Sequence, residues 1–148
     1  MKKVILAVAV LMSSISHASE NAKSFFDEYT KLGSNFDVKV ASLYANDAKI
    51  HSYRVYPHGT ERQMEITGEQ WKVLVQRVMP LAKMKNDKST FKNIAIKSEG
   101  NGYKIKAHRY SENKCYTDKG YYMLLKRTEK GQLEIVEEYM ETQPQSDC

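Results

Sequence analysis

The stretch Gly102–Thr142 decides the fold, because it contains three runs rich in aromatic and β-branched residues. The runs read YKIKAHRY at 103–110, GYYMLLKR at 120–127 and GQLEIVEEYM at 131–140, and a shorter segment, CYT, lies at 115–117. Glycine or asparagine residues, which favour turns, separate the runs. Since consecutive strands usually pair, the stretch predicts an antiparallel meander. The rest of the chain then has to cover one face of that sheet.

Apolar residues upstream recur at helical spacing in three places. Residues 20–32 predict a first helix with one apolar stripe, ended by Gly33 in a left-handed conformation. Residues 36–44 predict a second, short helix. A third helix is predicted to begin at Thr67, which forms a capping box with Gln70.

The third helix carries an apolar stripe from Trp71 to Ala82. Pro80 lies late in this stripe, so we expect a kink or an early end there. Residues 83–90 are polar and are predicted to form a linker.

Two further segments alternate between apolar and polar residues as strands do. Residues 48–56 predict a strand that Pro57 closes, and residues 91–97 predict a strand that turns into the meander through 100–102. Residues 60–66 alternate only loosely and fit either a short strand or an ordered loop. The chain therefore predicts one domain without internal repeats.

The N-terminal residues predict a secretory signal. Met1-Lys2-Lys3 is positively charged, Val4–Met12 is apolar but too short to span a bilayer, and Ser16-His17-Ala18 offers the small residues that a signal peptidase reads. We expect a cleaved signal peptide over 1–18, a domain over 19–142 and a polar tail over 143–148. The mature protein is then periplasmic or secreted, with no stable membrane anchor.

The charge balance gives little indication of a partner. The full chain has a formal net charge of +5, and without Lys2 and Lys3 there are 21 basic residues against 18 acidic ones. Basic and acidic residues are interspersed, which is typical of a solvated surface. We therefore expect no nucleic-acid partner.

Two cysteines, Cys115 and Cys148, remain after the predicted cleavage. In an exported protein an even count indicates a disulfide, which would hold the tail against the strand of Cys115. Pairing within one chain, pairing between two chains and free thiols all remain open. A redox role has no Cys-x-x-Cys motif to support it.

The order of these elements resembles the nuclear transport factor 2-like superfamily, which includes ketosteroid isomerases and SnoaL-like polyketide cyclases. The local match is strongest at LYANDAKI, residues 43–50, which is similar to the family's passage from helix to strand. Gly68 resembles the glycine that opens the family's third helix, and residues 131–139 resemble its terminal strand. The resemblance implies an exported bacterial member with an α+β fold, in which N-terminal helices pack against a cone-shaped, curved antiparallel sheet.

One departure from the family pattern argues against steroid isomerase chemistry. In ketosteroid isomerases the proton-shuttling aspartate follows the same strand opening, and that position here is Ser52, which cannot take a proton from carbon at neutral pH. The isomerase's oxyanion tyrosine falls near Phe26 or Tyr29. Tyr29 is also well explained as a wall residue between helix and sheet.

Folds of this family leave a pocket between sheet and helices, so polar residues on the covered face are candidate site residues. Alternation along 103–109 places Arg109 inward, and alternation along 133–139 places Glu137 inward. The two could neutralise one another in a partly buried ion pair. Alternatively, Arg109 could bind a carboxylate or phosphate of a ligand.

The pocket candidates are Tyr29, Asp47, Ser52, Trp71, Arg109 and Glu137. Asp47 lies at a helix-to-strand junction, where an aspartate more often accepts backbone hydrogen bonds than protons. The histidines lack ligand spacing and no phosphate-binding glycine loop is present, so we expect no metal and no cofactor.

Two functions fit these features. The preferred hypothesis is a non-enzymatic exported domain that binds a small molecule or a protein partner and forms a homodimer through the open face of its sheet. The alternative is a small-pocket lyase or isomerase that uses Asp47, Tyr29, Arg109 or Glu137.

Overall fold

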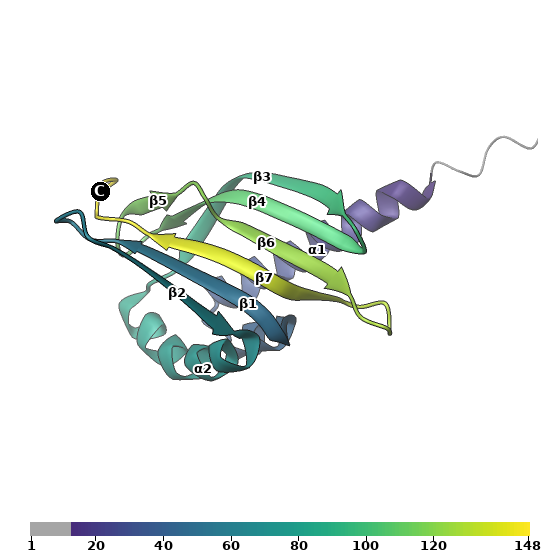
Figure 1. The fold of residues 1–148 in the computed structure, drawn as a ribbon, viewed down its shortest axis with the longest axis horizontal. Coiled ribbons are helices and arrows are strands. Elements are labelled where there is room, and N and C mark those ends of the chain that lie inside the picture. Colours follow the sequence, from purple (N-terminus) through teal and green to yellow (C-terminus); the bar gives the residue numbers. More distant parts are fainter. Residues whose placement is uncertain (1–12) are drawn as a thin grey trace, which may run out of the picture.

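A computed structural model describes residues 13–148, with side chains from residue 21 on. Most of the predicted signal peptide, residues 1–18, lies outside this part of the chain. Three helical segments and seven strands follow one another along it (Figure 1). No helix among the described residues is long and apolar enough to cross a membrane.

The first helical segments differ in detail from the prediction. Helix α1 (Ser13–Ser34) includes Gly33, and the left-handed residue that follows the helix is Phe36, with φ 56°. The predicted second helix is a short 3₁₀ helix, η1 (Val38–Leu43), whose start is capped by the Asp37 carboxylate accepting from the Lys39 N–H at 2.9 Å.

Helix α2 (Gly68–Lys85) begins as predicted. Thr67 Oγ1 accepts from the Gln70 N–H at 3.2 Å and Gln70 Oε1 accepts from the Thr67 N–H at 3.0 Å, which is a complete capping box. The expected early end at Pro80 is wrong, because the helix continues to Lys85. Pro80 lies on the exposed side, where water can satisfy the carbonyl that proline leaves without a donor.

The strands form one mixed, seven-stranded sheet. Its path is β2 (Glu61–Thr67), β1 (Tyr44–Val55), β7 (Leu133–Thr142), β6 (Tyr122–Arg127), β4 (Gly102–Ser111) and β3 (Ser89–Glu99), with β5 (Tyr116–Asp118) paired to β4. The predicted meander is confirmed, and residues 60–66 are mostly strand. All pairs are antiparallel except β1 and β7, which run parallel in the middle of the sheet.

The helices cover one face of the curved sheet and leave the other face open. Helix α1 contacts β3 and η1, while α2 contacts η1, β1 and β2 (Figure 1). This arrangement confirms the α+β architecture that the sequence indicates.

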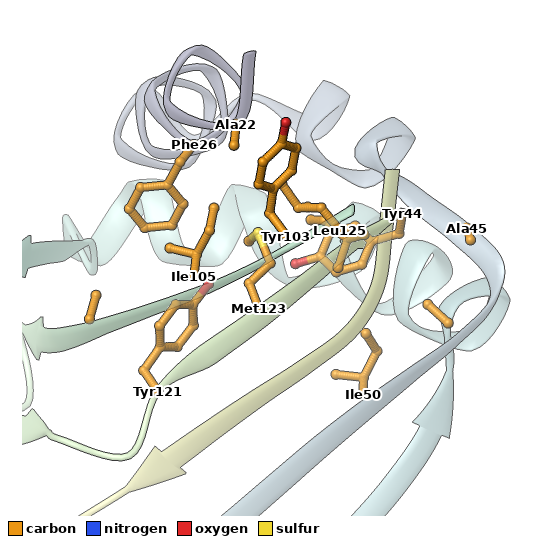
Figure 2. Packing of buried hydrophobic residues seen from close by; sticks show 13 residues of the cluster. Ala22, Phe26, Tyr44, Ala45, Ile50, Tyr103, Ile105, Tyr121, Met123 and Leu125 are labelled. Atoms are coloured by element: carbon orange, nitrogen blue, oxygen red, sulfur yellow. The ribbon is translucent and has the colours of Figure 1, made fainter. Parts of the chain in front are cut away.

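The core lies between α1 and the covered face of the meander. Figure 2 shows Phe26 of α1 close to Ile105 of β4, with Tyr121 and Met123 beside them. Tyr103, Ile105 and Ala107 are all buried, as alternation along β4 predicts.

A β-bulge in β7 changes which residues face the helices. Leu124 pairs with Glu137 but Leu125 pairs with Ile135, so Val136 is an extra residue in β7. Ile135 and Glu138 therefore both point toward the helices, and both are fully buried. The prediction that Glu137 faces inward is wrong, because strict alternation does not continue through the bulge.

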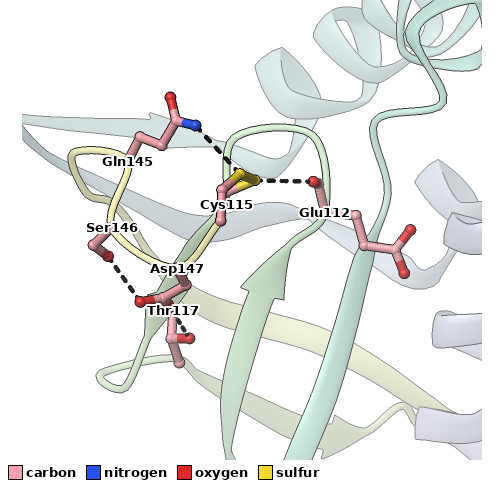
Figure 3. The surroundings of a disulfide bond; sticks show 7 residues. Glu112, Cys115, Thr117, Gln145, Ser146 and Asp147 are labelled. Carbon is pink, nitrogen blue, oxygen red and sulfur yellow. Dashed lines mark hydrogen bonds between the residues drawn. A yellow bond between two sulfur atoms is a disulfide. The ribbon is translucent and has the colours of Figure 1, made fainter.

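The C-terminal tail is fastened to β5. Cys115 and Cys148 form a disulfide with 5.1 Å between their Cα atoms (Figure 3). The tail also binds through the Ser146 and Asp147 N–H groups, which donate to the Cys115 carbonyl at 2.8 and 2.9 Å. Closing a loop across 33 residues contributes about 4 kcal/mol in the chain-entropy account. The pairing within one chain, left open by the sequence, is the one observed.

Candidate ligand-binding site between the helices and the sheet

A pocket of about 240 Å³ opens between α1, η1, α2 and the covered face of the sheet. Four aromatic residues line it, namely Tyr29, Tyr44, Trp71 and Phe91. Aliphatic and thioether side chains contribute the rest of its apolar wall, namely Val40, Val75, Val78, Met79 and Met140. An apolar cavity of this size with a few polar groups is the usual form of a small-molecule site.

Glu138 lies behind the aromatic wall and holds the hydroxyls of three tyrosines. Oε1 accepts from Tyr44 at 2.5 Å, and Oε2 accepts from Tyr121 at 2.5 Å and from Tyr29 at 2.7 Å. These tyrosines come from three separate parts of the chain, and the bulge in β7 is what brings the carboxylate to them. A buried carboxyl group requires such donors.

The protonation of this cluster follows from its burial. Burial raises the pKa of the Glu138 carboxyl, and the hydrogen bonds from the three tyrosines oppose that rise. Burial and the neighbouring Glu138 charge raise the pKa values of Tyr29, Tyr44 and Tyr121. The three phenols therefore remain protonated, and each one has a carboxyl oxygen to accept its hydrogen.

Arg109 reaches the pocket, as predicted, but it does not pair with Glu137. Its Nε lies 3.4 Å from the Asp118 carboxylate, which is fully buried. Its Nη2 donates to the Glu141 carbonyl at 2.7 Å, and Nη1 donates to Ser89 Oγ at 3.3 Å. Asp118 is the last residue of β5, and the pairing of β5 with β4 places Asp118 opposite Arg109. Arg109 is thus neutralised within the fold.

Trp71 lines the pocket from the first turn of α2 and packs edge to face against Tyr44, with 6.3 Å between ring centroids. Its buried Nε1 atom makes no hydrogen bond of good geometry, but its N–H lies close enough to the Tyr44 hydroxyl to oppose the rise in the pKa of that group.

The remaining candidates lie apart from this pocket. Asp47 is exposed and borders a separate hollow that also includes Glu137. Glu137 Oε1 lies 3.0 Å from His51 Nε2. Ser52 contributes to a further pocket of about 370 Å³ together with His51 and Tyr139.

The structure therefore brings Tyr29, Trp71 and Arg109 together and leaves Asp47, Ser52 and Glu137 elsewhere. The four residues of the enzymatic alternative do not converge, because Tyr29 and Arg109 line the covered pocket while Asp47 and Glu137 border the other hollow. Among the residues that the structure describes, no three histidine, cysteine, aspartate or glutamate side chains are grouped to hold a metal ion.

Sequence reasoning missed Glu138, Tyr44, Tyr121 and Asp118 as parts of the site. The available signal was the excess of tyrosine, ten residues against one tryptophan. Buried tyrosines need a partner for their hydroxyls, so this excess points to a buried acceptor, but it does not say which glutamate provides it.

The sequence matches no protein-family model and no curated protein. Solved structures do match, at low identity. An NTF2-like protein with a cystatin-like fold from Novosphingobium aromaticivorans aligns with a TM-score of 0.61 and 10% identity, over 86% of this chain and 82% of that one. An NTF2-like protein of unknown function from Pseudomonas putida aligns with a TM-score of 0.56 and 14% identity, over 85% and 86% of the two chains.

A protein from Parabacteroides distasonis, whose name gives a provisional assignment as a ketosteroid isomerase, aligns with a TM-score of 0.57 and 15% identity. The alignment covers 81% of this chain and 83% of that one. At such identities these likenesses concern the fold, and the chemistry has to be argued from the residues present.

Proposed function

We propose that this chain, which has the nuclear transport factor 2-like fold, is an exported binding protein for a small, largely apolar molecule. The observation that carries this proposal is the 240 Å³ pocket, whose wall is mainly aromatic and aliphatic. A ligand there would be enclosed by α1, α2 and the sheet, and burial of its apolar surface would supply the affinity.

Binding is favoured over catalysis by the state of the polar groups around the pocket. The Glu138 carboxyl is held by three phenols, and Arg109 is held by Asp118, Ser89 and the Glu141 carbonyl. A general acid or base must reach the reacting atom with a free proton or lone pair. The Glu138 carboxyl and the Arg109 guanidinium are instead engaged by their own neighbours in the fold.

Export is supported by the predicted signal peptide over 1–18 and by the disulfide between Cys115 and Cys148. Disulfides persist in oxidising compartments such as the periplasm and the extracellular space. We therefore propose that the protein is located in the periplasm or is secreted.

Filling the pocket tests the proposed function. Met79 lines the pocket, and Met84 is 83% exposed on the same helix without lining it. In a thermal-shift screen of apolar metabolites, compounds that stabilise the wild type are expected to lose about tenfold or more in affinity for Met79→Trp. The matched control Met84→Trp should keep the wild-type affinity. Equal binding by both variants would exclude this pocket as the site.

We further propose that the open face of the sheet pairs with a second copy of the chain. On the open face, Lys97, Lys104 and Lys106 of β3 and β4 lie at one end of two cross-strand rows. Toward the other end the rows contain Glu137 of β7, Lys49 and His51 of β1, and Glu65 of β2. Tyr122 and Tyr139 stack between these ends, with 5.5 Å between ring centroids. A two-fold axis through the stacked tyrosines would place Lys104 and Lys106 near Glu65 and Glu137 of the second copy.

Light scattering after size-exclusion chromatography tests the pairing. The wild type is expected to have the mass of a dimer at low salt and to shift toward the monomer as salt is added. The double change Lys104→Glu with Lys106→Glu should give a monomer, while Lys83→Glu on the exposed side of α2 should not. A wild-type monomer at every concentration and salt would contradict the proposal.

A further inference from the structure

The charges around the pocket do not cancel when they are counted by position. Arg109 is matched by Asp118, which lies 3.4 Å away and is fully buried. Glu138 is also fully buried, but its hydrogen-bond partners are three neutral phenols. The two other charged residues that line the pocket, Asp87 and Lys88, are of opposite sign and cancel in the count. When Glu138 is ionised, the groups around the pocket therefore carry one uncompensated negative charge. Electrostatic interactions are strong in such a poorly solvated place.

The hydroxyl groups next to the pocket have a defined polarity. Tyr29 and Tyr44 both line the pocket, and both give their single phenolic hydrogen to Glu138. Each phenol oxygen then has only its lone pairs left, so it can accept a hydrogen bond but has no hydrogen to give. A ligand group that meets these oxygens has to be a donor.

The aromatic wall also favours a positive charge. Tyr29 and Phe91 pack edge to face at 6.2 Å between centroids, and Tyr44 and Trp71 do so at 6.3 Å, so two aromatic pairs border the same cavity. The faces of such rings attract ammonium groups, and tryptophan does so most strongly.

We propose that the ligand of this pocket is an organic ammonium ion, with an apolar body and a primary or quaternary amine, rather than a carboxylate of the same size. The proposal rests on the proposed function, because it names the class of ligand for that pocket. It assigns no ligand-binding role to Arg109, because the guanidinium is paired with the Asp118 carboxylate within the fold.

The dependence of binding on pH follows from the groups that face Glu138. These are Tyr29 of α1, Tyr44 of β1, Tyr121 before β6 and, at longer range, Arg109 of β4. Burial raises the pKa of Glu138, and a bound cation favours the ionised carboxylate. The affinity for an amine should therefore rise with pH as Glu138 ionises, while the affinity for a neutral alcohol should not change.

The test is calorimetric titration of the purified protein with three probes that share one apolar body: phenylpropylamine, phenylpropanol and phenylpropanoate. At low salt and near-neutral pH, the amine is expected to bind roughly tenfold more tightly than the alcohol, and the carboxylate more weakly than both. Equal or tighter binding of the carboxylate would overturn the proposal while leaving the proposed function standing. If none of the three probes binds, the ammonium proposal fails. If no apolar compound of the thermal-shift screen binds either, the proposed binding function fails with it.

Two variants identify the source of the preference. Glu138→Gln removes the charge at nearly constant shape, and it is expected to reduce the preference for the amine over the alcohol from about tenfold to about twofold or less. Trp71→Leu keeps an apolar wall without the ring, and it should weaken amine binding severalfold more than alcohol binding. If Glu138→Gln does not fold, Trp71→Leu decides alone. An unchanged preference in the folded variants would overturn the proposal.

Discussion

Replacing Glu138 with alanine is expected to destabilise the protein by about 3 kcal/mol or more, because three buried hydroxyls lose their acceptor at once. Tyr44 and Tyr121 are buried, and Tyr29 packs against the same cluster. An orphaned donor in such surroundings costs about 1 kcal/mol or more, and the removed side chain also leaves a cavity. Urea unfolding of the variant measures the loss.

Glu137 provides a matched control at the neighbouring position. Its side chain is partly exposed on the other face of the sheet, where it lies 3.0 Å from His51 Nε2. Such a partly exposed polar contact contributes about 1 kcal/mol at most, so Glu137→Ala is expected to change stability little. If the two alanine variants lost equal stability, or if Glu137→Ala lost more, the bulge at Val136 would be wrongly placed.

Replacing Gly102 with alanine is expected to destabilise the protein by about 4 kcal/mol or to prevent folding. An added Cβ would lie 1.7 Å from the Leu125 carbonyl oxygen, which belongs to the neighbouring strand β6. A backbone oxygen cannot move aside without parting β4 from β6. Gly68, where a Cβ would lie 1.8 Å from the Ala45 carbonyl oxygen, should respond in the same way.

Gly33→Ala is the control for this prediction. Apart from the adjoining backbone of α1, no atom lies within 4 Å of a Cβ placed there. Alanine is the better helix former by up to about 1 kcal/mol, so the change should be neutral or stabilising. Circular dichroism during thermal unfolding compares the variants. A Gly102→Ala protein as stable as Gly33→Ala would show that β4 and β6 are farther apart than the structure has them.

Most of the fold could be predicted because the signals that encode it are local. The capping box at Thr67 and the alternation along β4 each depend on residues a few positions apart. The 3₁₀ form of η1 and the passage of α2 through Pro80 depend on exposure and neighbouring contacts, so they could not be read from spacing.

The site was harder to predict, because one extra residue in β7 exchanges the two faces of the strand. Alternation from Ile135 places Glu137 inward, whereas the bulge at Val136 places Glu138 there. The partner of Arg109 was missed for a similar reason. Asp118 lies on a three-residue strand whose pairing with β4 depends on the whole sheet.

The parallel contact between β1 and β7 has a consequence for how the molecule forms. The two strands are neighbours in the middle of the sheet, yet about half of the chain separates them in sequence. A nascent chain cannot assemble this centre until its last strand has been synthesised, and folds that depend on such distant pairings form slowly. The central strand pair can therefore form only when synthesis is nearly complete.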